Sequence, residues 1–246
     1  GLHRISEKTG AHVVMGCGYY KFRWHPPGME TKTVSCIEDE IVRDITEGVE
    51  GTGIRAGVIG EIGVSEFLER NEEKSLVASA RAHLRTGAAI NLHVHLIAKD
   101  EEEALRMRVL DILECGGVNL NRVIVSHCEG GAADPGYHER IAHRGAYIEY
   151  DLFRMEVLRS PSIPAYEAEA RILRRLIERG FLNRILISQD ICYRKLLLRN
   201  GGWGYGHILR DVAPRLIAAG IDEAELRAIM VENPKTVFPC SVGERR

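Results

Sequence analysis

The stretch Ala56-Gly57-Val58-Ile59-Gly60-Glu61-Ile62 decides the fold class. Its branched apolar residues favour a β-strand, and because nearly every side chain in it is apolar, both faces of that strand are expected to be buried. The following segment, 66–84, has the periodicity of an amphipathic helix instead. A buried strand followed by a helix is the βα unit from which parallel sheets are built.

The same unit recurs along the whole chain. Five further apolar runs that are expected to be strands lie at 12–18, 89–94, 122–127, 146–151 and 184–190. Three further segments that are expected to be helices lie at 101–114, 166–179 and 205–219. Glycine stands shortly after several of the predicted helices, where a left-handed residue ends a helix. The alternation predicts an α/β fold with a parallel sheet in a single domain over residues 1–246, with the connection 21–34 forming a loop over one rim.

Composition excludes several classes of protein. The chain has 246 residues, of which 45% are hydrophobic, so it can bury a sizeable core. Its net charge of −2, from 33 basic and 35 acidic residues, argues against a nucleic-acid platform, which needs a basic stripe. No apolar run reaches the ~18 residues of a membrane span. The expected partner is therefore a small-molecule substrate, and neither a nucleic acid nor a membrane.

Cysteine usage indicates the compartment. The six cysteines form no CxxC pair, so no zinc finger or thioredoxin-type motif is present. Several of them lie inside apolar runs and are expected to be buried free thiols. Free thiols are typical of the reducing cytoplasm, which is the predicted localisation.

Acid–base side chains recur where the predicted strands end. Five of the six runs carry one near the carboxyl end: Glu61, His93, His127, Asp151 and Asp190. The carboxyl ends of many strands converge on one site in a (β/α)8 TIM barrel, whereas a doubly wound sheet gathers ligands at a single switch point. No glycine-rich nucleotide fingerprint follows a strand. The pattern therefore favours the barrel.

Carboxylates and imidazoles on different strands are suitable ligands for zinc or a related divalent metal. We expect Glu61, His93, His127 and Asp190 to form this site. His95 lies on the same strand face as His93, so spacing alone allows either histidine, or both, to be a ligand. Two bridged cations lower the pKa of a shared water, and a nearby Asp can accept the proton. Each residue also has a simpler structural explanation, such as Asp190 capping a helix.

Four of these stretches together resemble a known family. They are 56–66, 87–93, 121–128 and 188–190, supported by 200–205 and 232–234. In order and spacing they resemble the phosphotriesterase-like group of the amidohydrolase superfamily. Within that group they are most similar to the phosphotriesterase homology proteins, in which a Glu replaces the carboxylated Lys between the metals.

The resemblance implies a (β/α)8 barrel with two divalent metal ions, usually zinc. It implies that Glu61 bridges the metals, that His93 rather than His95 binds the more exposed metal together with His127, and that Asp190 binds the buried metal and acts as the general base. Tyr20 resembles an aromatic that lies over the metals and contacts substrate. Family members are often dimers, so a homodimer is the expected assembly.

Further substrate contacts are expected from residues outside the family motifs. Arg154, Tyr193 and Arg194 are candidates for holding an anionic substrate group, because guanidinium offers a planar fork to carboxylate or phosphate. His138 and His143 are expected on an exposed helix, without a functional role.

Two departures from the family pattern affect the expected function. Leu152 follows Asp151 where the lactonase branch has an Arg. No HxH motif precedes His12, so on the family pattern barrel strands one and two are expected to be missing from this chain. An intact member would carry roughly 60 to 70 further residues ahead of it.

The expected function is a metal-dependent hydrolase that uses a binuclear-metal-activated hydroxide to cleave an ester-type bond. A lactone or phosphorylated sugar lactone is the preferred substrate, with promiscuous phosphotriesterase activity. The alternatives are an amide hydrolase of the same family and, if the HxH strand is truly absent, a non-catalytic metal-binding protein. A metal-free barrel using a Schiff-base lysine, with Lys21 as the nearest candidate, is the weakest alternative.

Overall fold

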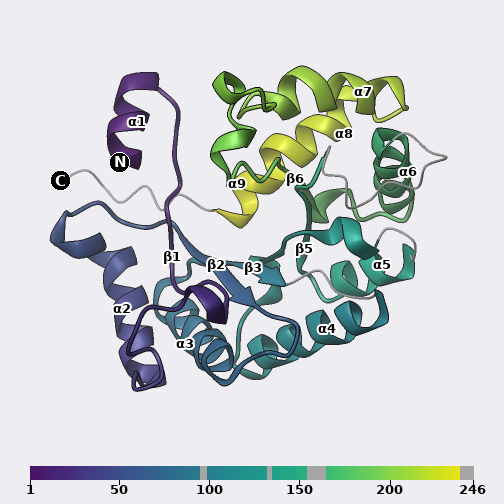
Figure 1. Cartoon of the computed structure of the whole chain (residues 1–246). Coiled ribbons are helices and arrows are strands. Elements are labelled where there is room, and N and C mark those ends of the chain that lie inside the picture. Colours follow the sequence, from purple (N-terminus) through teal and green to yellow (C-terminus); the bar gives the residue numbers. More distant parts are fainter. Residues whose placement is uncertain (95–98, 132–134, 154–164, 239–246) are drawn as a thin grey trace. The chain divides into compact units, whose positions relative to one another are not determined.

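The computed structural model describes residues 1–94, 99–131, 135–153 and 165–238 (Figure 1). The chain forms two compact units, Gly1–Ile124 and Val125–Arg246. The division falls inside strand β4 (Val123–Val125). The expectation of one domain stays a prediction.

Six strands occur where the sequence predicts them. They are β1 (Gly16–Cys17), β2 (Val58–Val64), β3 (Ala89–Val94), β4 (Val123–Val125), β5 (Tyr147–Tyr150) and β6 (Ile185–Ile187). Their order in the sheet is the order of the chain. The pairs β1–β2, β2–β3 and β5–β6 are parallel. The prediction of an α/β fold with a parallel sheet is confirmed.

β1 is shorter than predicted. The run 12–18 was expected to be a strand buried on both faces, but only Gly16–Cys17 pairs with β2. Val13 and Val14 are exposed, at 42% and 54%. In the described sheet β1 is an edge strand, and edge strands are commonly short because only one side of the backbone is paired.

Helices follow the strands. The α-helices are α1 (Leu2–Thr9), α2 (Val34–Thr46), α3 (Arg70–Thr86), α4 (Lys99–Cys115), α5 (Pro135–His143), α6 (Ala165–Glu178), α7 (Ala213–Ala218), α8 (Glu223–Arg227) and α9 (Asn233–Val237). The predicted helix at 205–219 begins as a short π-helix, η9 (Ile208–Val212), that continues into α7. Gly87 ends α3 in the left-handed conformation, with φ 70°, and donates its N–H to the His83 carbonyl, as the glycine pattern predicts.

The core of the first unit lies between β1–β3 and the helices α2 and α3, which run next to each other (Figure 1). α2 buries Ile37 and Ile41, one turn apart, and α3 buries Leu76. β2 buries Ile59 and Ile62 completely. Burying a side chain of this size contributes roughly 1.5–3 kcal/mol, so this apolar layer holds the strand ends in place.

In the second unit β5 packs against α5, and β6 packs against η10 (Ala228–Glu232) and α9. Tyr147, Ile148 and Ile185 are fully buried, and α6 contributes Leu173. The Asn233 side chain at the start of α9 donates to the carbonyls of Leu182 and Ile185, which ties the C-terminal helix to the base of β6.

The described cysteines are all free thiols. Cys17 and Cys128 are buried as expected, whereas Cys36, Cys115 and Cys192 are exposed. Cys240 lies outside the described residues. Within the described ranges, no helix is both long and apolar enough to cross a membrane.

Candidate metal centre

A β-bulge aims Glu61 away from the apolar core. Ile59 pairs with Ile90 and Ile62 pairs with Leu92, so Gly60 and Glu61 together face the single residue Asn91. A bulge of this kind bends a strand and redirects one side chain. A Cβ on Gly60 would lie only 2.7 Å from the Asn91 carbonyl oxygen, so this position requires glycine. As a result Glu61 is the one exposed residue of a strand that is otherwise largely buried.

Tyr20 lies over His93. The Tyr20 hydroxyl is 3.1 Å from His93 Nε2 and 3.2 Å from Nδ1, and the two ring centroids are 4.7 Å apart. His93 is near the end of β3, and Tyr20 follows β1. A Cβ on Gly63 would collide with the backbone of Tyr20 and Lys21, so glycine at 63 lets the segment after β1 pass directly against β2.

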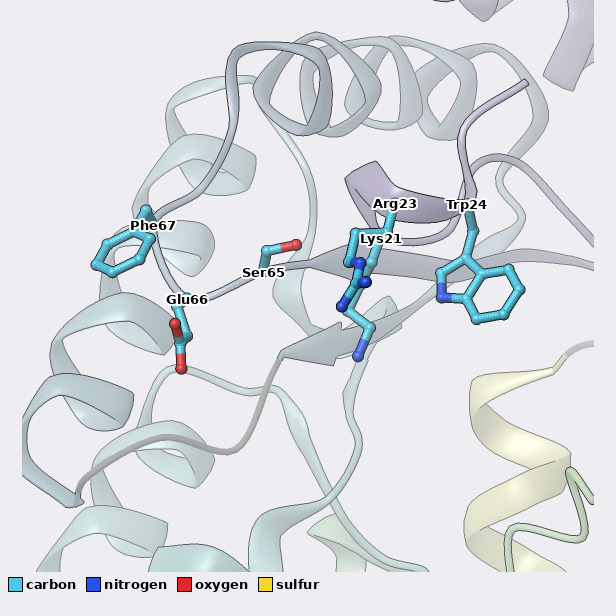
Figure 2. Close-up of a pocket in the computed structure, with 6 residues that line it drawn as sticks. All are labelled: Lys21, Arg23, Trp24, Ser65, Glu66 and Phe67. Carbon is cyan, nitrogen blue, oxygen red and sulfur yellow. The ribbon is translucent and has the colours of Figure 1, made fainter. Parts of the chain in front are cut away.

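A cavity of about 650 Å³ lies beside Lys21, the residue that follows Tyr20 (Figure 2). It lies in the first unit and is lined by Lys21, Arg23, Trp24, Ser65, Glu66 and Phe67. One wall follows β1 and the other follows β2. Both walls are therefore built from segments at the carboxyl ends of parallel strands, where barrel enzymes place their binding residues.

His127 is held by Asp151. His127 Nδ1 lies 2.7 Å from Asp151 Oδ1, and the His127 backbone N–H donates to Asp151 Oδ2 at 3.2 Å. Both side chains are buried. Because the carboxylate can only accept, the imidazole donates from Nδ1, and Nε2 then carries the lone pair that a metal needs. The two hydrogen bonds stabilise a left-handed backbone at His127, with φ 58°, of the kind that clusters at functional sites.

A second buried carboxyl group supports this arrangement. Glu129 Oε1 accepts the Leu152 N–H at 2.6 Å, which ties the turn after β4 to the turn after β5. Burial and the neighbouring Asp151 raise the pKa of Glu129 to about 8. Glu129 is therefore mainly protonated at neutral pH, which spares the site a second buried negative charge beside Asp151.

The expectation of an exposed His138 is wrong. His138 is fully buried in α5, and its Nε2 lies 2.8 Å from the Cys128 carbonyl oxygen. It packs edge-on against Tyr150 of β5. The ring therefore fixes the turn that directly follows His127. The helical periodicity of the sequence could not reveal this contact of His138, because the carbonyl belongs to a turn outside the helix.

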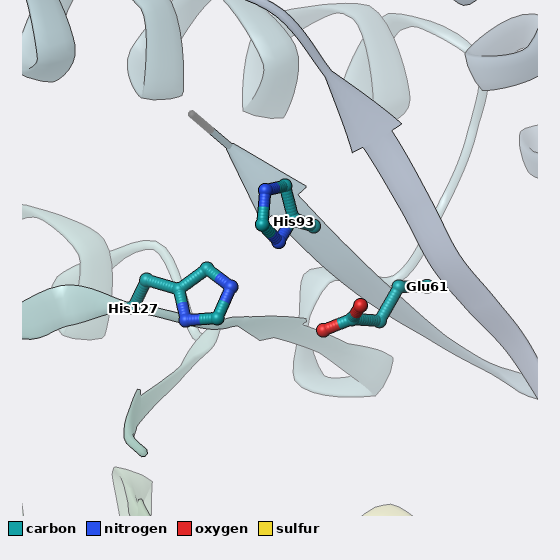
Figure 3. A group of neighbouring side chains, drawn as sticks. All are labelled: Glu61, His93 and His127. Atoms are coloured by element: carbon teal, nitrogen blue, oxygen red, sulfur yellow. The ribbon is translucent and has the colours of Figure 1, made fainter. Parts of the chain in front are cut away.

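Three predicted ligands come together. Glu61, His93 and His127 each place one ligand atom within 4.8 Å of the others (Figure 3). One carboxylate and two imidazoles at this spacing fit a single divalent cation such as zinc. Among the described residues this group does not include Asp190. Asp190 lies after β6 with φ 37°, and its Oδ2 is 3.5 Å from Cys192 Sγ.

The other predicted site residues have simpler placements. Tyr193 is 62% exposed, with Lys195 Nζ 5.6 Å from its ring centroid. Arg194 is exposed in η7 (Arg194–Leu196). Arg154 and His95 lie outside the described residues. The sequence identified Asp151 only as a strand-end carboxylate without a role, and it did not identify Glu129. The available signal for Asp151 is its position at a strand end, where a carboxylate can orient a metal-binding histidine.

Comparison with known proteins agrees with this geometry. The sequence profile of the phosphotriesterase family matches residues 1–238. N-acetyltaurine hydrolase of Danio rerio is 34% identical over 239 residues, which cover 95% of this chain and 67% of that protein. The human N-acetyltaurine hydrolase is also 34% identical, with the same coverage.

Solved structures give the same result. A resiniferatoxin-binding protein from Rhodobacter sphaeroides superposes with a TM-score of 0.89 at 39% identity, covering 96% of this chain and 66% of that one. The phosphotriesterase homology protein from Escherichia coli, solved with phosphate in its active site, gives 0.84 at 32% identity, covering 96% and 78%. The chain thus spans about two thirds of the length of several relatives.

A parallel α/β sheet with carboxylate and imidazole side chains at its strand ends agrees with the class that the comparisons show, the metal-dependent hydrolases built on a barrel. Within that class, this chain belongs to the phosphotriesterase family. The predicted family and fold class are confirmed.

Proposed function

We propose that this chain holds two divalent metal ions, zinc first among the candidates, and hydrolyses a carboxylic acyl bond. The observation that carries the proposal is the convergence of Glu61, His93 and His127. Glu61 is assigned to bridge the metals, with His93 and His127 on one of them and Asp190 on the other. When bound, such ions lower the pKa of water and polarise a carbonyl oxygen.

The residues of the chain contribute orientation and proton transfer. Asp151 fixes the tautomer and the ring plane of His127. Tyr20 restrains His93 and presents its hydroxyl at the site. Asp190 is the proposed general base, and its carboxylate would take the proton of the attacking water. Arg154, Tyr193 and Arg194 remain candidates for contacting substrate.

Two classes of acyl substrate are favoured. An N-acyl amide comes first, because the two curated relatives described above, each 34% identical, are named N-acetyltaurine hydrolases. A lactone or phosphorylated sugar lactone comes second, on the sequence argument given above. A water activated by bound metal ions would attack either carbonyl carbon, so the candidate ligands are compatible with both classes. Phosphotriester hydrolysis would be a side activity.

The compartment and the assembly are also proposals. Free thiols throughout the described chain support the cytoplasm as the site of action. A homodimer is the proposed assembly.

The proposed function is tested with a panel of N-acyl amides, lactones and an organophosphate triester, assayed before and after chelation and zinc return. Turnover should disappear with the metal and return with it. Asp190→Asn should keep the metal-free fold and lose most turnover, whereas Asp39→Asn, an exposed carboxylate paired with Arg85, should behave as the unsubstituted protein. Turnover that survives chelation would refute the proposal, and stoichiometric metal without turnover would favour a metal-binding protein.

A further inference from the structure

The cavity lined by Lys21, Arg23, Trp24, Ser65, Glu66 and Phe67 has walls that are fixed before any ligand arrives (Figure 2). Glu72 of α3 is fully buried and accepts from both walls. It accepts the Phe22 N–H at 2.8 Å, and the Ser65 N–H at 3.1 Å together with the Ser65 hydroxyl. One carboxylate therefore joins the segment after β1 to the segment after β2.

Lys74 anchors the same loop further along. Its Nζ donates to the carbonyls of Met29, Glu30 and Lys32, at 2.9, 3.2 and 3.0 Å. The His25 ring closes the other end by a contact of 2.7 Å to the Tyr20 carbonyl. Because the backbone around the cavity is already held in place, little binding free energy is lost to ordering the loops when a ligand binds.

The cavity lining combines positive charge with exposed aromatic surface. Two cations, Lys21 and Arg23, outnumber the single carboxylate, Glu66. Trp24 and Phe67 are 73% and 80% exposed, the two most exposed large apolar side chains of the described residues. An exposed aromatic ring in the wall of a cavity offers a ligand a flat apolar surface. Guanidinium and ammonium groups recognise carboxylate, sulfonate and phosphate, and aromatic rings stack on flat apolar bodies.

The cavity adjoins a metal ligand within the same unit. Lys21 follows Tyr20 directly, and its Nζ lies 5.3 Å from the centroid of the Tyr20 ring. The Tyr20 hydroxyl in turn lies 3.1 Å from His93 Nε2. A ligand in the cavity would thus reach His93 past a single aromatic side chain.

We infer that this cavity binds the anionic end of the substrate: a carboxylate, sulfonate or phosphate group carried on a flat apolar body. That the bound anion belongs to the substrate rests on the proposed function, in which the acyl group of the same molecule would lie at the metals. Lys21 and Arg23 bind the anion, Trp24 and Phe67 cover the apolar part, and Glu66 limits the affinity by repulsion.

Direct binding tests the inference without turnover. Trp24 and Trp203 are the two tryptophans of the chain, so Trp203→Phe leaves Trp24 as the fluorescent reporter. Benzoate, benzenesulfonate and phenyl phosphate are titrated against the neutral isostere benzamide, and calorimetry on the unsubstituted protein repeats the comparison. The anions should quench Trp24 and bind about tenfold or more tightly than benzamide, since charge-assisted hydrogen bonds are about twice as strong as neutral ones. The order of the three anions identifies the preferred head group.

Charge variants supply the matched controls. Lys21→Gln and Arg23→Gln should each weaken benzoate binding about tenfold and leave benzamide unchanged, which corresponds to one lost ionic contact. Glu66→Gln should strengthen anion binding, and Arg4→Gln, an exposed cation of α1, should change nothing.

Equal affinity for benzoate and benzamide, or equal behaviour of Arg23→Gln and Arg4→Gln, would overturn the inference. Failure of the proposed function shows itself separately, as a zinc-loaded protein that binds anions at Trp24 but hydrolyses no acyl substrate.

Discussion

Replacing Asp151 by Asn tests how the fold prepares His127 to bind a metal. Asp151 accepts two hydrogen bonds from His127, from Nδ1 and from the backbone N–H. An amide offers one oxygen and one NH2 group, so one of the two His127 donors would face another donor. If the NH2 group turns toward the ring, the imidazole proton moves to Nε2, and that nitrogen can no longer coordinate.

The expected magnitude follows from this geometry. A buried hydrogen bond to a charged group contributes about 1.5–3 kcal/mol. Because 1.4 kcal/mol corresponds to a factor of ten, the affinity for metal should fall about 10- to 100-fold, the range seen for partners of metal-binding histidines. The Asp151 carboxylate is buried, so added salt should not cancel the effect.

The assay is competition between the protein and a chelator for zinc, with thermal unfolding of the metal-free protein as the measure of folding. Asp39→Asn is the control, because Asp39 is an exposed carboxylate whose ion pair with Arg85 should contribute little. A folded Asp151→Asn protein with unchanged zinc affinity would show that this hydrogen bond does not set the His127 tautomer.

Four further perturbations have defined outcomes. Glu61→Gln should lower the number of zinc ions bound per chain, and a full complement by elemental analysis would exclude a bridging role. Tyr20→Phe removes the hydroxyl contact to His93 and should cost about 1 kcal/mol of zinc affinity at most, measured by chelator competition. Glu72→Leu leaves its donors without an acceptor and should lower the free energy of unfolding in urea by about 3 kcal/mol, with Glu72→Gln milder. Burial raises the pKa of Glu169 from 4.5 to about 8, so the folded state holds this proton more tightly than the unfolded chain. As the pH rises from about 4.5 to about 8, the free energy of unfolding should therefore fall, by up to about 1.4 kcal/mol per pH unit. Glu169→Gln should flatten this part of a plot of unfolding free energy against pH.

Much of the fold follows from local sequence. The run at 89–94 coincides with β3, and the other strands lie inside the predicted runs or within two residues of them. This succeeds because strands of a parallel sheet are apolar on both faces and contrast with the amphipathic helices between them. The shortness of β1 was not predicted, because Val13 and Val14 have the apolar pattern of a buried strand although both are exposed.

The site was predictable to the extent that its residues stand at strand ends. Glu61, His93 and His127 were identified by that position, and they converge. The contacts that support these residues were not predictable, although Asp151 itself was noted at a strand end, because those contacts join segments distant in sequence. Asp151 lies 24 residues from His127, and Glu72 lies 50 residues from Phe22. The bulge that redirects Glu61 has a sequence signal, Gly60, whose meaning appears only beside Asn91.

The most direct test of the account is a zinc titration of the metal-free protein in which bound metal and hydrolysis of an N-acyl amide are measured in the same samples. Turnover should rise in proportion to the metal bound at Glu61, His93 and His127, and His127→Ala should abolish both metal binding and turnover. Turnover in the metal-free protein, or His127→Ala with unchanged zinc binding, would contradict this prediction.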